Sequence, residues 1–232
     1  MALHRHDEVV LLLGAPGAGK GTLARYLADV LGVPHVASGD LLRENHQHGT
    51  ELGRAAQAYM DRGDLVPDDL VVEMIMRRLD EPDAVHGALL DGFPRTVPQS
   101  TALESRLSQR GGRVQAAIYV EVPTRVLIER LAGRWMCRAC QASYHELFNP
   151  ARVSGVCDGC SGELYQRSDD KRGVVANRID VYLRDTLPVV ERYQQRGILQ
   201  RIDGDQAISV VRATLREAFG LNDSVAEYES VA

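Results

Sequence analysis

The chain has 232 residues, of which 44% are hydrophobic and 25% are charged, and its formal net charge at pH 7 is -5. A chain of this length can bury a full core as one large domain or as one domain with small insertions. The negative charge argues against a protein that coats nucleic acid or binds membranes through a basic patch. No apolar run approaches the length of a membrane span, and the first residues, MALHRHDE, lack the order of a signal peptide. We therefore expect a cytoplasmic protein.

Short apolar runs alternate with longer helical patterns along the chain, which predicts an α/β fold with a parallel sheet wrapped by helices. The strand-like runs are VVLLL at 9, PHVAS at 34, ALLD at 88, AAIYVEV at 116 and ILQRID at 198. Apolar residues at helical spacing predict helices over 20–32, 67–79, 97–110, 124–132, 174–195 and 205–219. Two segments interrupt the alternation, a helix-rich one after the second strand and a cysteine-bearing one from about 133 to 170. The last twelve residues, 221–232, have no convincing period, and we expect a flexible tail.

The segment GAPGAGKGT, which ends at Thr22, nearly fits the phosphate-binding pattern G-x-x-x-x-G-K-[ST]. Gly14, Gly19 and Lys20 hold their places, but Gly21 stands where the pattern has a hydroxyl. A buried strand precedes the segment and a helix follows it, so backbone amides and the helix N-terminus can bind phosphate oxygens. The segment predicts a nucleoside triphosphate site in which Lys20 reaches the β- and γ-phosphates. By itself it does not distinguish a switch, a motor and a transferase.

Arginines beyond the ends of two other strands indicate a second phosphorylated substrate. LLDGFPRTVPQ carries Asp91 and Arg95 after one strand, and SGDLLRE carries Ser38 and Arg43 after another. Ligands of open α/β sheets gather at the carboxyl ends of strands, and two arginines can grip one phosphate. A switch of the GTPase type would need N-K-x-D after a strand. NRID, with Arg178 at the lysine place, lies inside a helical pattern, and we interpret it as a coincidence.

The four cysteines form two C-x-x-C pairs separated by sixteen residues, a spacing typical of four-thiolate zinc sites. They are Cys137, Cys140, Cys157 and Cys160. The alternatives are disulfides, free thiols, a redox motif, and a zinc ribbon that binds nucleic acid. A reducing compartment disfavours disulfides. Residues 133–170 contain four arginines and no lysines against five acidic residues, a charge distribution that disfavours nucleic-acid binding. We expect a structural zinc ion that takes no part in chemistry.

Taken together, the motifs resemble those of adenylate kinases with a long, zinc-bearing lid. GAPGAGKGT, SGDLLR, GDLV, DGFPRTVPQ, ERLAGR, YQRSDD and NRIDVY follow the family's order, and the match spans about residues 8–219. The resemblance implies a P-loop nucleoside monophosphate kinase fold with a five-stranded parallel sheet flanked by helices. It implies a core formed by 1–36, 67–132 and 171–220, a helical AMP-binding insert at 37–66, and a zinc-binding lid at 133–170.

The resemblance also implies roles for individual residues, with Gln99 reading an adenine edge of AMP and Arg130 packing on the ATP adenine. The residues implied to bind ATP are Gly17, Ala18, Gly19, Lys20, Gly21, Thr22, Arg130, Arg134, Ser143, Tyr144 and Gln206. Those implied to bind AMP are Ser38, Arg43, Asp64, Leu65, Val66, Gly92, Phe93, Pro94, Arg95, Gln99, Arg167 and Arg178. Those implied to act in catalysis are Lys20, Asp91, Arg95, Arg134, Arg167 and Arg178.

The implied reaction is reversible transfer of the γ-phosphoryl group of Mg-ATP to AMP, giving two ADP. The AMP phosphate is already ionised, so alignment and charge neutralisation suffice without a general base. Because Gly21 offers no hydroxyl, we expect phosphate oxygens and waters to hold Mg²⁺, with Asp91 orienting the waters. We expect a monomer that binds neither nucleic acid nor membranes. A kinase for UMP, CMP or GMP is the first alternative, and a nucleotide-dependent switch or zinc-linked binding module is the second.

The lid departs from the family pattern at several positions. Trp135 replaces a common arginine, Gln141 replaces a usual glycine after the first cysteine pair, and Lys171-Arg172-Gly173 replaces an acidic helix start. Positive charge and a glycine are mildly unfavourable at a helix start. We therefore expect the local geometry of the lid and the energetics of its hinge to differ from those of the family.

Overall fold

The computed structural model describes residues 8–219, so the flexible tail predicted at 221–232 lies outside the described residues. Its central sheet has five parallel strands in the order β2-β3-β1-β4-β8. All five predicted strands are confirmed. Their bounds are β1 Glu8–Gly14, β2 His35–Ala37, β3 Ala88–Asp91, β4 Arg113–Glu121 and β8 Leu199–Asp203.

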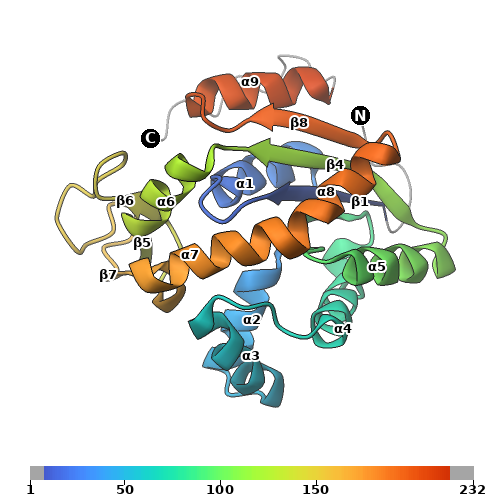
Figure 1. Cartoon of the computed structure of the whole chain (residues 1–232), viewed down its shortest axis with the longest axis horizontal. Helices are drawn as coiled ribbons and strands as arrows, with labels where there is room; N and C mark the ends of the chain where they lie inside the picture. The colour runs from blue at the N-terminus through green and yellow to red at the C-terminus, as the bar shows by residue number, and fades with distance from the viewer. Residues whose placement is uncertain (1–7, 220–232) are drawn as a thin grey trace.

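Helices connect the strands, as the alternation of patterns predicts (Figure 1). Their bounds are α1 Lys20–Leu31, α2 Ser38–Gln47, α3 Glu51–Arg62, α4 Asp68–Leu79, α5 Val97–Gln109, α6 Thr124–Ala132, α7 Arg172–Val181, α8 Leu187–Gln195 and α9 Ile208–Ala218. Short 3₁₀ turns cover Pro82–Ala84 and Ser168–Asp170. Within residues 8–219, no helix combines the length and apolar character that a bilayer span requires.

The helix predicted over 174–195 is interrupted by a π-helical segment, Tyr182–Thr186, between α7 and α8. Pro188 lies in the first turn of α8. A proline has no N–H to donate to the preceding turn, and its ring crowds that turn, so the regular helical ladder cannot run through it. The sequence pattern predicted the helix correctly but not this break.

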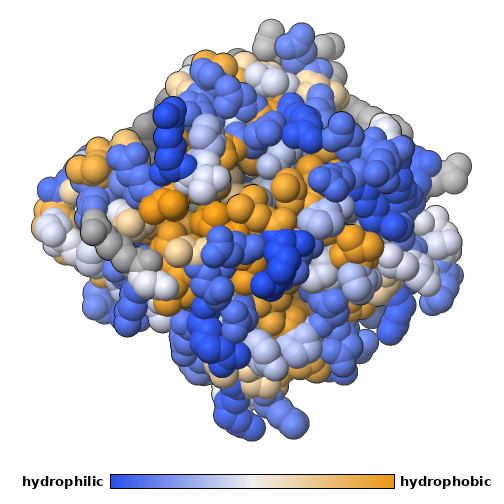
Figure 2. Space-filling view, viewed as in Figure 1, coloured by the Kyte–Doolittle hydropathy of each residue, from blue (hydrophilic) through white to orange (hydrophobic). Residues whose placement is uncertain are grey.

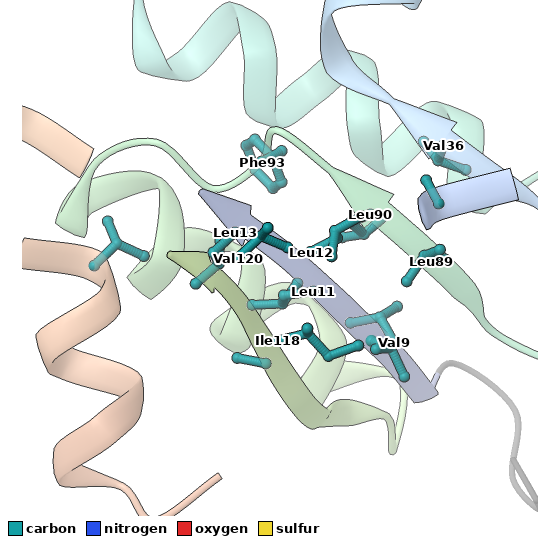
Figure 3. Packing of buried hydrophobic residues seen from close by; sticks show 14 of the residues in the cluster. Val9, Leu11, Leu12, Leu13, Val36, Leu89, Leu90, Phe93, Ile118 and Val120 are labelled. Carbon is teal, nitrogen blue, oxygen red and sulfur yellow. The ribbon is translucent and has the colours of Figure 1, made fainter. Parts of the chain in front are cut away.

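The core forms around the apolar strand runs. Val9, Leu11, Leu12 and Ile118 are fully buried, and Figure 3 shows their side chains packed on and beside β1. Parallel strands covered by helices on both faces read as continuous apolar runs, which explains why VVLLL does not alternate with polar residues. The rigid sheet fixes the loops that follow the carboxyl ends of β1 and β3.

Two segments depart from the strand–helix alternation, where the sequence predicted insertions. Helices α2 and α3 project from one end of the sheet (Figure 1). Between α6 and α7 the chain forms a separate three-stranded antiparallel sheet in the order β6-β5-β7. Its strands are β5 Arg134–Cys137, β6 Ser143–His145 and β7 Leu164–Tyr165. The sequence predicted no strands here, because runs of two to four residues are too short to show a period.

Candidate active site

A cavity of about 1070 Å³ opens at the carboxyl ends of β1 and β3 and extends between the two insertions. All residues predicted to bind ATP line this cavity, and so does Asp91. The residues predicted to bind AMP also line it, with the exception of Phe93. The fold therefore brings together side chains that are separated by up to about 190 positions, from Gly17 to Gln206.

Phe93 is the exception among the residues predicted to bind AMP, and its contact to AMP stays a prediction. Its side chain is fully buried in the hydrophobic core, and Figure 3 shows the ring beside Leu13 at the end of β1. An aromatic side chain at a strand end gains more from burial in the core than from contact with a wet cavity. Phe93 anchors the loop from beneath, while its neighbours Gly92 and Pro94 face the cavity.

The glycine-rich loop places Lys20 in the wall of the cavity. The Lys20 ammonium donates hydrogen bonds to the carbonyl oxygens of Gly14 at 2.9 Å and Ala15 at 3.0 Å. Gly17 has a φ of 85°, and a Cβ there would meet the Leu127 carbonyl oxygen at 2.9 Å. Only glycine meets both requirements without strain. The loop thus packs against α6, and its lysine lines the cavity.

The residues predicted to bind AMP form a connected group around the end of β3. Ser38 Oγ donates to the Gly92 carbonyl at 2.7 Å, and Arg95 Nε donates to the same oxygen at 2.7 Å. Gln99 is held by two hydrogen bonds, one accepted from the Arg95 N–H at 2.7 Å and one donated to Asp68 at 2.8 Å. Asp68, which the sequence did not single out, therefore sets the orientation of the Gln99 amide.

The arginines of the lid side are oriented by two neighbouring carboxylates. Arg134 donates to both oxygens of Asp170, at 2.8 and 2.6 Å, and Arg178 Nη1 donates to Asp170 at 2.7 Å. Arg178 Nη1 also lies 3.2 Å from the Asp169 carboxylate. The Asp170 side chain has no exposure, so this is a buried anion shared by two guanidinium groups. The YQRSDD motif contained both aspartates, but nothing in the sequence indicated which arginines they bind.

The cavity is electrostatically prepared for an anion. The pKa of Lys20 is lowered to about 8, mainly by burial, with Asp91 opposing this effect and Arg95, Arg134 and Arg178 adding to it. Burial and neighbouring arginines lower the pKa of Arg95 to about 10. The same two causes lower the pKa of Arg167 to about 10. Burial also disfavours the charge of Arg134, but Asp170 outweighs it and the pKa of Arg134 is raised. The carboxylates near Lys20, Arg95 and Arg167 therefore do not fully compensate these buried cations. A bound polyphosphate would supply the missing negative charge.

Two further residues belong to this site although the sequence did not single them out as ligands. His35 Nε2 lies 3.2 Å from Asp91 Oδ2, so the carboxylate expected to orient magnesium-bound waters already has a partner on β2. Asp40 pairs with Arg43 and lies 3.8 Å from Arg167 Nη2. The pKa of Asp40 is lowered because Arg43 and Arg167 outweigh its desolvation by burial. Asp40 thereby connects α2 to the last part of the lid segment 133–170.

Arg130 and Gln206, which are predicted to lie near the ATP adenine, line the cavity at α6 and at the loop after β8. Arg130 donates to the Gly204 carbonyl at 2.9 Å and lies 3.3 Å from Asp205, beside Gln206. These contacts fix the guanidinium plane between α6 and the loop after β8. A planar guanidinium held in this way can stack on an aromatic base.

The four cysteines meet in one cluster, in which the four sulfur atoms lie within 4.8 Å of one another. The Cys137–Cys160 and Cys140–Cys157 sulfur distances are 3.4 and 3.5 Å, far from a covalent disulfide. Zinc bound tetrahedrally by thiolates at about 2.3 Å requires sulfurs about 3.8 Å apart, so this donor set fits the ion. The pKa of Cys157 is lowered to about 6, chiefly by the Tyr144 hydroxyl and also by backbone amides, against the opposing effect of desolvation. The cluster is therefore compatible with a closed metal site.

Gln141, which follows the first cysteine pair, adopts a φ of 58°. This is the left-handed region that glycine enters without strain. The structure thus shows why glycine is the more favourable residue at this position. The chain turns there with a side chain that lines the main cavity.

A second cavity of about 750 Å³ lies on the other side of the glycine-rich loop, and Ala15 forms part of its wall. Figure 2 shows apolar side chains gathered on this face, between α6 and α8. Its polar residues include Tyr119 and Tyr182, whose hydroxyl groups are 3.1 Å apart. None of the predicted site residues line this second cavity.

The parallel sheet, the glycine-rich loop after β1 and the two insertions around one cationic cavity define a P-loop kinase of the nucleoside monophosphate class. A family model described as adenylate kinase matches residues 12–198. The chain therefore belongs to the adenylate kinase family, as its motifs indicated.

Individual relatives agree with this assignment. The chain is 50% identical to an adenylate kinase of Methanocella arvoryzae over 208 residues, which cover 90% of this chain and 96% of that protein. It is 48% identical to an adenylate kinase of Carboxydothermus hydrogenoformans over 209 residues, with coverage of 90% and 98%. It is 50% identical to an adenylate kinase of Moorella thermoacetica over 211 residues, with coverage of 91% and 97%. The similarity includes both insertions, since it extends over nearly the whole described chain.

Proposed function

We propose that this adenylate kinase reversibly transfers the γ-phosphoryl group of Mg-ATP to AMP, giving two ADP. The observation that carries the proposal is the convergence of Lys20, Arg95, Arg134, Arg167 and Arg178 on one cavity. Burial, followed by neighbouring arginines, lowers the pKa values of Lys20, Arg95 and Arg167, so a bound anion would stabilise these three cations. Such an arrangement suits two phosphate chains brought end to end.

The glycine-rich loop and Lys20 would hold the ATP phosphates, and Arg130 and the backbone near Gln206 would hold the adenine. Ser38, Arg43, Arg95 and the backbone of 64–66 would hold AMP. Gln99 keeps an N–H beyond its bond to Asp68, and this hydrogen can read an adenine edge. The chemistry then requires only alignment and neutralisation of the charge that builds on the transferred group.

Arg134, Arg167 and Arg178 are suited to contact the transferring phosphoryl group. Asp170 and Asp169 would aim two of these side chains before substrate arrives, which avoids reorganisation during the reaction. We propose that 37–66 and 133–170 close as mobile units over a core of the remaining residues. Closure would exclude water as a competing phosphoryl acceptor.

We further propose magnesium and zinc as the metals. Magnesium arrives with ATP, and Asp91, which lines the cavity near Lys20, is placed to orient its waters. Zinc bound by the four cysteines would brace the lid, because four protein ligands leave no position open for catalysis. Elemental analysis of protein purified without a metal-binding tag tests this assignment, and clearly less than one zinc per chain with no other metal would contradict it.

The function is tested by mixing the protein with Mg-ATP and, separately, AMP, UMP, CMP and GMP, and then resolving the products. AMP should give ADP at the highest rate, and no ADP beyond slow ATP hydrolysis would refute the proposal. Lys20→Met should abolish transfer while the far-ultraviolet circular dichroism stays unchanged. Full activity in that variant would refute the role assigned to Lys20.

A further inference from the structure

One side chain, Tyr144, belongs to both the nucleotide cavity and the cysteine cluster. It lies in the middle of β6 and lines the cavity together with Ser143 and Gln141. Its hydroxyl lies 3.3 Å from the sulfur of Cys157 and accepts a hydrogen bond from the Asp158 backbone N–H at 2.8 Å. Because the backbone N–H is the donor in that second bond, the hydroxyl hydrogen remains available to the sulfur.

The surrounding strands keep the two sites at a fixed separation. Strand β5 begins at Arg134, a predicted contact of the phosphate chain, and ends at Cys137, a predicted metal ligand. Tyr144 stands opposite Trp135 in the pairing of β5 with β6. Cys140 itself lines the nucleotide cavity. A shift of the strand pair would therefore move an arginine, a cavity wall and metal ligands together.

We propose that Tyr144 is a positioning residue that couples ATP binding to metal binding: its ring contacts the nucleotide, and its hydroxyl orients the Cys157 sulfur toward the metal. Groups that orient metal ligands from outside the coordination sphere affect metal affinity strongly. A bound nucleotide that fixes the ring also fixes the hydroxyl, so ATP slows release of the metal. By reciprocity, the metal-loaded lid binds ATP more tightly. The inference rests on the proposed placement of ATP in this half of the cavity.

The chain offers a matched control in Tyr165. This residue lies on β7 of the same small sheet, opposite Met136, with its ring 4.3 Å from the Arg138 guanidinium carbon. It does not line the nucleotide cavity. Among the described residues, no hydrogen bond joins its hydroxyl to a cysteine. Tyr165→Phe thus removes the same atom from the same sheet without touching the proposed link.

The test measures the rate at which zinc-loaded protein releases its metal to an excess of a chelating dye. Wild type, Tyr144→Phe and Tyr165→Phe are compared with and without a non-hydrolysable ATP analogue, in excess Mg²⁺ so that the analogue does not strip the zinc. Tyr144→Phe should release zinc about 10- to 100-fold faster than wild type. The analogue should slow release about fivefold or more in wild type and Tyr165→Phe, but less than twofold in Tyr144→Phe.

Equal release rates in wild type and Tyr144→Phe would overturn the proposal, and so would equal protection of both by the analogue. Calorimetric titration with the analogue separates this inference from the function. If the analogue binds wild type without slowing zinc release, the coupling is refuted while the kinase function stands. If the analogue does not bind, the proposed ATP site itself fails.

Cobalt substitution gives a second measurement that does not depend on kinetics. Tetrahedral Co²⁺ has absorption bands that respond to the geometry of its thiolate ligands. Tyr144→Phe should shift the thiolate-to-cobalt band, whereas Tyr165→Phe should leave it unchanged. An unchanged spectrum in a Tyr144→Phe protein with native circular dichroism would show that the hydroxyl does not orient Cys157.

Discussion

Strand β1 of the central sheet is buried along its whole length and lies in a large hydrophobic cluster, whereas in the small sheet of 134–165 the buried cluster consists of Cys137, Cys157 and Leu164. A fully buried leucine contributes about 1.5–3 kcal/mol of hydrophobic stabilisation, so the central sheet needs no further support. Three buried side chains cannot offset the conformational entropy of some forty residues. The difference teaches that apolar burial holds the core together, whereas the lid needs other support, which we propose comes from a metal on its four cysteines and from contacts to the core.

Of the changes proposed here, metal removal should produce the largest difference between the response of the lid and that of the core. Stripping the metal with a chelator, or replacing Cys157 by serine, should lower phosphoryl transfer by about 10³-fold, because the lid arginines lose their fixed positions. The urea denaturation midpoint of the core should change little. Product assays and denaturation curves measure the two effects, and restored activity after zinc addition to the chelated protein is the control. A parallel collapse of the core would show that the two regions fold as one unit.

A substitution that removes apolar side-chain volume should lower the free energy of unfolding much more in the core than in the lid. Leu11→Ala, at a fully buried position of β1, should lower the free energy of unfolding by about 3–5 kcal/mol. Leu147→Ala in the lid, where the side chain is 67% exposed, should change it by less than about 0.5 kcal/mol. Urea denaturation measures both variants. Similar costs at the two positions would contradict the view that the core alone depends on apolar burial.

Asp170 tests the connection between the two regions, since it binds Arg134 of β5 and Arg178 of α7. Asp170→Asn should lower the free energy of unfolding by about 3 kcal/mol, because two buried guanidinium groups lose their anion. Added ATP should offset part of the loss by supplying negative charge. The control is Glu163→Gln, whose exposed pair with Arg138 should contribute less than about 1 kcal/mol. An Asp170→Asn protein as stable as wild type would refute this role.

The smallest predicted effect is a pH dependence at Lys20, where charges of core and lid meet. Its folded pKa, about 8, lies below the ordinary value of 10.5, mainly because of burial. Between these pH values the unfolded chain binds a proton that the folded chain does not, so this group makes the ligand-free protein more stable as pH rises. ATP affinity should fall over the same window, by up to about tenfold per pH unit above 8, because the phosphates lose a cation.

Calorimetric titration at several pH values measures this affinity. Lys20→Arg keeps its charge throughout the window, so any ATP affinity that it retains should vary much less with pH. An affinity that falls equally in wild type and Lys20→Arg would assign the pH dependence to another group. Loss of the pH dependence of ATP affinity in protein stripped of metal would show that the lid arginine Arg134 contributes to the lowered pKa of Lys20.

The sequence predicted the elements and loops of the core well because those signals are local. VVLLL, the glycine-rich loop and the helix at 20–32 follow one another directly, and each can be recognised without knowing its neighbours in space. The cysteine pairs were equally clear, since their spacing reflects the geometry of a tetrahedral metal site. The short strands of the lid were missed because they have no period of their own and are stabilised by pairing.

The sequence by itself thus determined the family, the order of elements and most candidate ligands, because each depends on residue type at fixed spacing. Only the tertiary structure decided that Phe93 belongs to the core, that Asp68 orients Gln99 and that Asp170 joins Arg134 to Arg178. It likewise placed the Tyr144 hydroxyl on Cys157. Some of these contacts join side chains that are far apart in the sequence. In the others the side chain could point in several directions, and the packing of the folded chain selects one of them.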